Sequence, residues 1–451
     1  MSSNSMNCIS PIDGRYHKAT LPLVGFFSEK ALIRNRVIVE IAYFKALCRI
    51  VPELQGVDKS KVEGLKAIYE SFSDHDAFLI KEIEKTTNHD IKAVEYFIKE
   101  KFQDAGLADY QEFVHFGLTS QDINNTALPL MIKGGIEQVL LPAIDDLQSC
   151  LFEMAVRWKD VTMLARTHGQ PATPTTMGKE ILVFHARIEE QLRQVKACKY
   201  PGKFGGATGN FNAHHVAYPD IDWNRFADEF LQNLGLTRSY PTTQIDHYDN
   251  LATIFDNLKR ICTILIDLNR DFWTYISMDY FRQEVANGEV GSSTMPHKVN
   301  PIDFENSEGN AGIAIALLEH FSSKLPVSRL QRDLTDSTVS RNIGVAFAHF
   351  LISLNGTKRG LSKVKLNEPA LVKDLEYNSA VIAEAIQTIL RKINYPQPYE
   401  KLKELTRSNQ KITLEAISNF IDSLEVSEAQ KVQLKKITPF NYIGIQPDSL
   451  K

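Results

Sequence analysis

The stretch from Thr242 to Asn287, TTQIDHYDNLATIFDNLKRICTILIDLNRDFWTYISMDYFRQEVAN, contains neither glycine nor proline. Within it, apolar side chains recur at alternating steps of three and four residues, at Leu251, Ile254, Leu258, Ile261, Leu265, Leu268, Phe272 and Tyr275. This heptad spacing keeps one apolar stripe on the same face of a helix along its whole length. The stretch therefore predicts a long α-helix that packs against partner helices.

Four more segments indicate helices of the same kind. Apolar residues follow helical spacing from Ile136 to Met154 and from Ile181 to Val195, and segments near 304–324 and 341–363 supply two more. Five long amphipathic helices predict a bundle. A helical solenoid is the alternative, but no repeat of about 34–47 residues supports it. Strand patterns are weak and no strand–helix–strand alternation occurs, so the fold class is predicted to be mainly α.

The length and composition predict a soluble protein of several domains. At about 150 residues per domain, 451 residues allow roughly three domains. We expect an N-terminal helical domain over 1–118, a central long-helix bundle over 119–365 and a C-terminal helical domain over 366–451. A hydrophobic fraction of 43% and a charged fraction of 24% are typical of globular proteins. The net charge of −4 argues against a nucleic-acid-binding surface covering the molecule.

The sequence also predicts a cytoplasmic protein that does not span a membrane. Its five cysteines are scattered and form no CxxC pair, which argues against a zinc ribbon and a disulfide framework. The longest wholly apolar run, from Ala311 to Leu318, is far shorter than the roughly 20 residues that a bilayer requires. The first residues, MSSNSMNCISPIDGRY, lack the apolar segment of a secretory signal.

A cluster of glycines invites a comparison with phosphate-binding loops. Its members are Gly202, Gly205, Gly206 and Gly209. Their spacing matches neither the dinucleotide-binding GxGxxG pattern nor the P-loop, so a tight turn between bundle helices is the favoured interpretation, because glycine permits positive φ. No HExxH motif occurs, and the adjacent pair His214–His215 lacks metal-ligand spacing. Neither a metal nor a cofactor is therefore predicted.

The segment with the densest polar chemistry is the loop from Gly288 to Pro301, GEVGSSTMPHKVNP, directly after the long helix. It combines two adjacent hydroxyls, a lysine, an asparagine and backbone amides. Such a loop can bind carboxylates and can surround a base with positive potential. A flexible surface linker is the usual alternative for a loop of glycine and serine. The combination of Ser-Ser, His-Lys and Asn-Pro within fourteen residues favours a functional loop instead.

Residues 291–301, GSSTMPHKVNP, resemble the signature loop of the fumarase/aspartase superfamily, whose pattern is GSSxMPxKxNP. His297 and the following IDFEN at 302–306 are similar to the adenylosuccinate lyase family, whereas fumarase-like members more often carry glycine at the His297 position. The similarity to the bacterial branch of that family extends over SPIDGRY at 10–16, TTNHD at 86–90, FGLTSQDIN at 116–124, RTHGQPATP at 166–174, TTQID at 242–246 and QRDLTDSTVSRN at 331–342.

The resemblance implies a three-domain fumarase/aspartase-like fold and an enzyme that eliminates fumarate from a succinyl group on nitrogen. Two substrates are implied: adenylosuccinate, which gives AMP, and the succinylcarboxamide imidazole ribotide of purine biosynthesis (SAICAR to AICAR). The reaction needs a base for a weakly acidic C–H, donors for the developing aci-carboxylate and an acid for the departing nitrogen. By resemblance, Ser292 is the base, as a serinate. His168 is the general acid, a role that suits an imidazole because it titrates near neutrality.

The same resemblance implies a set of substrate-binding residues. Contacts with the succinyl carboxylates are expected from Thr119, Ser120, Ser293, Lys298 and Asn300. Other substrate contacts are expected from Asn88, His89, Asp90, Gln244 and Asn306. The phosphate is expected at Arg15, Tyr16, Arg332, Ser337, Thr338 and Arg341. His89 is an alternative proton carrier but is assigned to binding. His115 is predicted to be structural.

Two other functions stay open at this point. A different superfamily member, such as argininosuccinate lyase or fumarase, would not require a phosphate cluster between Arg332 and Arg341. A bundle retained without catalysis, as among the lens crystallins of this superfamily, would not require Ser292, Lys298 and His168 together. The resemblance also implies a homotetramer in which His168 and Ser292 of one site come from different subunits. No nucleic-acid or membrane partner is expected.

Overall fold

The computed structural model describes residues 6–284, 295, 298–406 and 412–450, and it is mainly helical, as the sequence predicts. The chain divides into two compact units, each assembled from three separate segments. Unit 1 consists of Met1–Ile144, Gln191–Leu265 and Gly309–Asn355, and unit 2 of Asp145–Glu190, Ile266–Glu308 and Gly356–Lys451. The domain boundaries expected after residues 118 and 365 stay a prediction, because these units follow spatial contacts rather than continuous segments.

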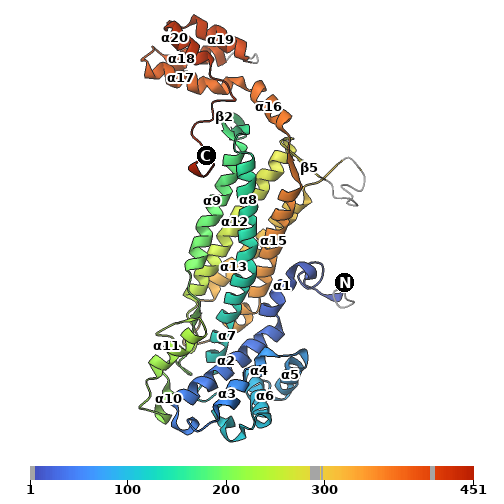
Figure 1. The fold of residues 1–451 in the computed structure, drawn as a ribbon, viewed down its shortest axis with the longest axis vertical. Coiled ribbons are helices and arrows are strands. Elements are labelled where there is room, and N and C mark those ends of the chain that lie inside the picture. The colour runs from blue at the N-terminus through green and yellow to red at the C-terminus, as the bar shows by residue number, and fades with distance from the viewer. Residues whose placement is uncertain (1–5, 285–294, 296–297, 407–411, 451) are drawn as a thin grey trace. The chain divides into compact units, whose positions relative to one another are not determined.

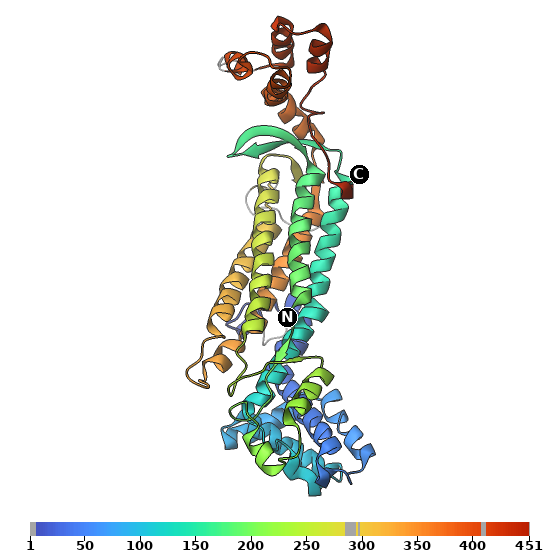
Figure 2. The ribbon, with the colours of Figure 1, turned by 90° about the vertical axis from the view of Figure 1, so that its left-hand side faces the viewer.

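The five long helices lie where the sequence predicts them. They are α8 (Leu141–Arg157), α9 (Met177–Ala197), α12 (Asp249–Ser277), α13 (Ile302–Lys324) and α15 (Ile343–Lys363). Each contributes residues to both units, and within each unit their segments lie side by side (Figures 1 and 2). The predicted seam of α12 is buried from Leu251 to Phe272, and Tyr275 is half-buried. Burial of this stripe is what holds the long helices together, since apolar area removed from water stabilises the packed state.

Unit 1 also contains shorter helices around an aromatic-rich core. They are α1 (His17–Phe27), α2 (Glu29–Ile50), α3 (Lys59–Gly64), α4 (Ala67–Glu70), α5 (Asp74–Thr87), α6 (Asp90–Asp104), α7 (Ser120–Gly135), α10 (Asn212–Ala217), α11 (Trp223–Asn233) and α14 (Thr335–Ser340). Helix α2 packs against α7, and α5 packs against α6 (Figure 1). Tyr43, Phe204 and Phe230 are among the rings that fill the core between them.

The C-terminal part of unit 2 has a small core of its own. Its helices are α16 (Glu368–Tyr377), α17 (Ala383–Lys392), α18 (Pro398–Thr406), α19 (Leu414–Ser423) and α20 (Glu428–Lys435). Ile386, Leu390 and Ile421 are among the side chains buried in that core. The helical character that the sequence predicts for residues 366–451 is thereby confirmed.

Strands are few and short among the described residues. An antiparallel hairpin joins β1 (Thr162–Thr167) to β2 (Gln170–Thr176), and a second antiparallel pair joins β5 (Phe281–Gln283) to β6 (Val364–Leu366). A parallel pair of two residues each joins β3 (Pro201–Gly202) to β4 (Thr237–Arg238). This parallel pair is too short to be a strand–helix–strand layer, so the mainly α class holds. The β1–β2 hairpin, in contrast, was not expected from the sequence.

One continuous helical run is long and apolar enough to cross a membrane by length and composition alone. It extends from Ser120 to Arg157 through α7, a π-helical turn at Ile136–Leu140, and α8. In its most apolar window 56% is buried inside the protein, as in the core helix of a globular protein. The run is therefore weak evidence for a span, and the absence of a membrane partner stays a prediction.

A buried ion pair fixes the first turn of α7. The side chains of Asp122 and Lys203 are both fully buried, with 2.7 Å between Asp122 Oδ1 and Lys203 Nζ. The same carboxylate oxygen accepts hydrogen bonds from the backbone amides of Gly205 and Gly206 at 2.9 and 3.1 Å. Asp122 Oδ2 accepts from the Thr119 amide at 2.9 Å. The glycine segment turns tightly at Gly206, which has a φ of +76°, as predicted, but it leads from α9 to the short helix α10 and does not join two bundle helices.

This pair leads to the first prediction. Replacement of Lys203 by methionine leaves the Asp122 carboxylate buried without its cation, so we expect the free energy of unfolding to fall by about 3–5 kcal/mol. The double variant Asp122→Asn/Lys203→Met removes both charges and should lose clearly less. Urea unfolding monitored by circular dichroism measures both variants. Equal losses in the single and double variants would show that the unpaired charge is not the cause.

Candidate functional site

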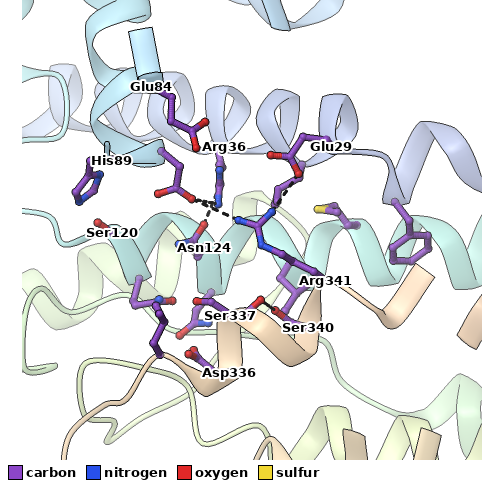
Figure 3. Close-up of a pocket in the computed structure, with 18 of the residues that line it drawn as sticks. Glu29, Arg36, Glu84, His89, Ser120, Asn124, Asp336, Ser337, Ser340 and Arg341 are labelled. Carbon is purple, nitrogen blue, oxygen red and sulfur yellow. Dashed lines mark hydrogen bonds and ion pairs between the residues drawn. The ribbon is translucent and has the colours of Figure 1, made fainter. Parts of the chain in front are cut away.

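A cavity of about 610 Å³ lies within unit 1, a volume in the range of ligand sites. Its wall is formed by the start of α2, the connection between α5 and α6, the first turns of α7 and the segment around α14 (Figure 3). Seven of the predicted site residues line it: Asn88, His89, Asp90, Ser120, Arg332, Ser337 and Arg341. Motifs that are more than two hundred residues apart in the sequence therefore meet at one cavity.

The first turn of α7 presents backbone amides and a hydroxyl to this cavity. Thr119 precedes the helix as its N-cap residue, and Ser120 is its first residue. The first amides of a helix lack intrahelical partners, and the helix dipole makes this end attractive to anions. The Ser120 hydroxyl at this end of the helix can therefore receive a carboxylate or a phosphate.

A network of charges crosses the cavity between α2 and the end of α14 (Figure 3). Arg36, which is almost completely buried, donates to Asp90 Oδ2 at 2.6 Å and to Asn124 Oδ1 at 2.9 Å. Arg341 lies 3.1 Å from Glu29 Oε2 and 3.8 Å from Asp90 Oδ2. Burial alone would raise the pKa of Asp90, but the Arg36 guanidinium and the Ile91 amide outweigh it and lower the pKa. Asp90 is thus held as a carboxylate.

Arg332 is held by two amides. Its Nη1 donates to Gln244 Oε1 at 3.4 Å, and its Nη2 lies 2.6 Å from the Gln121 carbonyl oxygen in the amide orientation that satisfies both groups. Gln244 in turn donates to the Ala207 carbonyl at 3.1 Å. The guanidinium has no carboxylate partner among the described residues, so it keeps its positive charge available to a ligand.

A buried tyrosine, Tyr248, lines another part of the cavity. Tyr248 OH donates to Asp336 Oδ2 at 3.0 Å and accepts from Asn125 Nδ2 at 2.7 Å. Burial and the nearby Asp336 charge raise the pKa of this phenol well above its usual value. The second oxygen of the Asp336 carboxylate is buried without a hydrogen-bond partner among the described residues. A ligand N–H or O–H could satisfy it.

The segment before α7 is anchored from two sides. His115 Nδ1 lies 2.6 Å from the fully buried Glu40 carboxylate, and Tyr43 OH donates to the Phe116 carbonyl at 2.8 Å. Burial would lower the pKa of His115, but the Glu40 charge outweighs it and raises the pKa. His214 Nε2 lies 3.0 Å from Tyr43 OH, and burial lowers the pKa of His214 to about 4. His115 therefore has the structural role that the sequence predicts.

The other predicted residues of unit 1 do not line this cavity. Thr119 and Gln244 contact residues next to the cavity: the Thr119 amide donates to Asp122, and Gln244 accepts from Arg332. Thr338 lies on α14 next to Ser337, and its carbonyl accepts from Asn342 Nδ2 at 3.3 Å. Arg15 is exposed and Tyr16 is half-buried at the turn before α1. Their predicted phosphate contacts stay a prediction.

Unit 2 carries the predicted general acid. His168 and Gly169 are the two central residues of the β1–β2 hairpin turn, with φ of +53° and +73°, and His168 is exposed. Positive φ at both central residues is the signature of a type I′ hairpin turn. The neighbouring Arg166 pairs with Asp374 of α16 at 2.6 Å, and Tyr280 OH donates to the same carboxylate. These contacts fix the strand that leads to His168.

The signature loop is only partly described. Lys298 is exposed, Asn300 is half-buried, and Asn306 is half-buried in the first turns of α13. Ser292 and Ser293, as well as His297, lie outside the described residues, so their predicted roles stay predictions. The described residues contain no group of three or more His, Cys, Asp or Glu that could hold a metal ion. The prediction of a metal-free and cofactor-free site stays open as well.

The sequence did not single out several residues of this wall. Gln121 and Asn124 lie within the quoted motif FGLTSQDIN, so the motif itself was a usable signal. Arg36 is a charged residue among the buried positions of α2, and a charge on an apolar helix face could have marked it. Glu29 and Tyr248 had no such signal, because only the folded chain brings them to the cavity.

Known proteins are similar to this chain over the regions that contain these motifs. A lyase family model matches residues 14–315, and a model of the adenylosuccinate lyase C-terminal region matches residues 328–443. An adenylosuccinate lyase of Dictyostelium discoideum is 57% identical over 458 residues, which is 99% of this chain and 98% of that protein. The adenylosuccinate lyase of Escherichia coli K12 is 48% identical over 447 residues, which is 98% of each chain.

Solved structures with low sequence identity show the same fold. A fumarate lyase from Mesorhizobium sp. BNC1 has a TM-score of 0.72 at 18% identity and covers 94% of each chain. The 3-carboxy-cis,cis-muconate lactonizing enzyme from Pseudomonas putida has a TM-score of 0.71 at 20% identity, covering 94% of this chain and 93% of that one. The predicted fold class is thereby confirmed.

The lowered pKa of His214 predicts how stability depends on pH. The folded chain keeps this imidazole neutral down to about pH 4, whereas the unfolded chain protonates it near its ordinary pKa of 6.5. The unfolded state therefore binds the extra proton between these values, and the free energy of unfolding should fall by roughly 3 kcal/mol as the pH drops from 6.5 to 4. The pKa of His115 is raised, so its stabilising contribution is complete below pH 6.5 and is lost only at higher pH, outside this window.

The variant His214→Gln retains an N–H donor for the Tyr43 hydroxyl oxygen but cannot titrate, so its unfolding free energy should vary less with pH in that window. The exposed His75, replaced by glutamine, is the matched control and should keep the wild-type pH dependence. Urea unfolding at several pH values measures all three proteins. An unchanged slope in the His214 variant would contradict the assignment.

Proposed function

The chain belongs to the adenylosuccinate lyase family, and on this premise we propose that it eliminates fumarate from adenylosuccinate and from the succinylcarboxamide imidazole ribotide of purine biosynthesis. The observation that carries this proposal is the 57% identity to an adenylosuccinate lyase over 99% of the chain. The cavity of unit 1 agrees with it, because two of the arginines and two of the serines that were predicted to bind the substrate meet there, namely Arg332, Arg341, Ser120 and Ser337. The products are AMP and fumarate from the first substrate, and AICAR and fumarate from the second.

The elimination divides between two groups of this chain. Ser292, as a serinate, takes the proton from the carbon next to a succinyl carboxylate, and the C–H electrons move into that carboxylate to give the aci-carboxylate intermediate. These electrons then return to form the double bond of fumarate, and the C–N bond breaks. Its electron pair goes to the nitrogen, which receives a proton from His168. Ser293, Lys298 and Asn300 hold the carboxylate and stabilise the aci-carboxylate intermediate. The support is the eleven-residue signature loop and the exposed hairpin turn that presents His168.

The nucleotide end of the substrate is assigned to the cavity of unit 1. Arg332 and Arg341 can bind a phosphate through parallel N–H groups, and Ser337 lies between them on α14. Asn88, His89 and Asp90 form the wall toward α5 and α6. The two guanidinium groups favour a phosphorylated substrate over argininosuccinate or malate, which have no phosphate to occupy both of them.

The proposal includes a homotetramer in the cytoplasm. The resemblance to the superfamily implies a site shared between subunits, and the long bundle helices are elements that could pack against those of other chains. All five cysteines are free thiols in the structure, which suits a reducing compartment. Phe152, Val183 and Trp273 are large apolar side chains exposed on the long helices, and a subunit interface would cover side chains of this kind.

An absorbance assay with adenylosuccinate tests the reaction, and two substitutions test the roles. Ser292→Ala and His168→Ala should each lose about 10²–10⁴-fold in turnover, the loss expected when a general base or acid is removed. Replacement of Lys298 by alanine should cost about 10²–10³-fold through lost stabilisation of the intermediate. Substrate binding should survive better than turnover in the first two variants. Near-normal turnover in either would refute its role, and wild-type inactivity would refute the proposed reaction.

Subunit mixing tests the shared site. Inactive Ser292→Ala and His168→Ala proteins are combined in equal amounts under conditions that exchange subunits. If each site takes its serine and its histidine from different chains, a site receives both intact groups with a probability of about one quarter, so about a quarter of wild-type activity should return. Size-exclusion chromatography of tagged subunits verifies exchange. No recovery after verified exchange would mean that one chain supplies both groups.

A further inference from the structure

The arginine of the cavity that is assigned to the phosphate has an anionic partner within the protein. Arg341 Nη1 lies 3.1 Å from Glu29 Oε2, and Figure 3 shows the guanidinium reaching from the end of α14 toward Glu29 and Arg36 on α2. Arg341 Nη2 is also 3.8 Å from Asp90 Oδ2. An incoming phosphate therefore meets a guanidinium whose charge is partly neutralised, and it meets two carboxylates beside it.

These two carboxylates differ in how firmly they are held. Asp90 pairs at 2.6 Å with Arg36, whose side chain is only 4% exposed, and it also accepts the Ile91 amide at 2.8 Å. Glu29 has no comparable anchor: its side chain is 46% exposed, and its other oxygen is 3.5 Å from the Lys81 ammonium. Glu29 can therefore rotate toward solvent, whereas Asp90 is fixed by its partners.

We propose that Glu29 is an internal counter-ion that pairs with Arg341 and yields it to the phosphate when the nucleotide binds. This proposal rests on the assignment of Arg341 to phosphate. A phosphate binds a guanidinium through two parallel hydrogen bonds and carries more negative charge than a carboxylate, so it displaces Glu29. The displaced carboxylate weakens the binding of every phosphorylated ligand, because the ion pair must break and because like charges then face each other. Glu29 thereby sets the affinity for the nucleotide product and helps to release it.

The charge balance of the cavity supports this role. Four acidic side chains, Glu29, Glu84, Asp90 and Asp336, line the cavity against three arginines, Arg36, Arg332 and Arg341. Asp90 and Asp336 have buried partners in Arg36 and Tyr248, and Glu84 pairs with Lys81 at 2.7 Å. Of the four, only Glu29 forms its closest ion pair with an arginine that is assigned to the phosphate.

Isosteric substitutions and two ligands test the proposal. Glu29→Gln is compared with Glu84→Gln, a glutamate of the same cavity whose closest ion pair is with Lys81 instead of Arg341. Calorimetry measures the affinity of each full-length protein for AMP and for adenosine, which lacks the phosphate. For Glu29→Gln we expect AMP to bind about two- to fivefold tighter at low salt, the size expected for an exposed ion pair, and adenosine to bind as before. Added salt should shrink the gain. Glu84→Gln should change AMP affinity less than the Glu29 variant.

Arg341→Gln separates a failure of this inference from a failure of the proposed function. If AMP affinity does not depend on Arg341, the phosphate assignment in the proposed function is wrong. If AMP affinity falls in Arg341→Gln but does not rise in Glu29→Gln, the counter-ion role alone is wrong. An equal gain for adenosine and AMP would also overturn it, because the effect would then not involve the phosphate. Thermal unfolding verifies that the half-exposed glutamine is tolerated.

Discussion

The buried charge of Asp122 is the constraint on which the cavity of unit 1 depends. A carboxylate out of contact with water costs several kcal/mol unless it is paired and hydrogen-bonded, so the chain has to bring partners to it. Lys203 supplies the opposite charge, and the Gly206 amide and the Thr119 amide supply hydrogen bonds on the two carboxylate oxygens. One side chain thus ties the start of α7 to the turn after α9. Because Ser120 follows Thr119 directly, the first turn of α7, which lines the cavity, is fixed by the same contacts.

Much of the fold could be predicted from the sequence, because helices reveal themselves through local periodicity. The α12 seam from Leu251 to Phe272 is buried as its spacing indicates, and the segments near 304–324 and 341–363 are helices as well. The β1–β2 hairpin was missed, although His168-Gly169 lies between two runs rich in threonine, and an X-Gly dipeptide in such a setting is a hairpin signal. The two compact units were also not predictable, since each combines three distant segments.

The candidate site was predictable only as far as its motifs extend. Resemblance identified Asp90, Ser120 and Arg341, and all three line one cavity. It did not identify Arg36, which holds Asp90, or Glu29, which pairs with Arg341. These partners come together only in the folded chain. Because arginine and glutamate also occur on many solvent-exposed helix faces, their presence in the sequence does not mark them as part of a site. A sequence motif therefore indicates the groups that contact a ligand more reliably than the groups that set their charge.

Two histidines beside the segment before α7, His115 and His214, have pKa values that are shifted by their buried surroundings. Glu40 raises the pKa of His115 and favours its charged form, whereas burial lowers the pKa of His214 and keeps it neutral. Both side chains are tied to buried partners, His115 to Glu40 and His214 to Tyr43, so they form part of the rigid frame beneath the start of α7. His168 lies instead on the exposed β1–β2 hairpin turn. The histidine that the sequence predicts to approach a ligand is thus accessible, whereas the two buried histidines hold the segment that leads into α7.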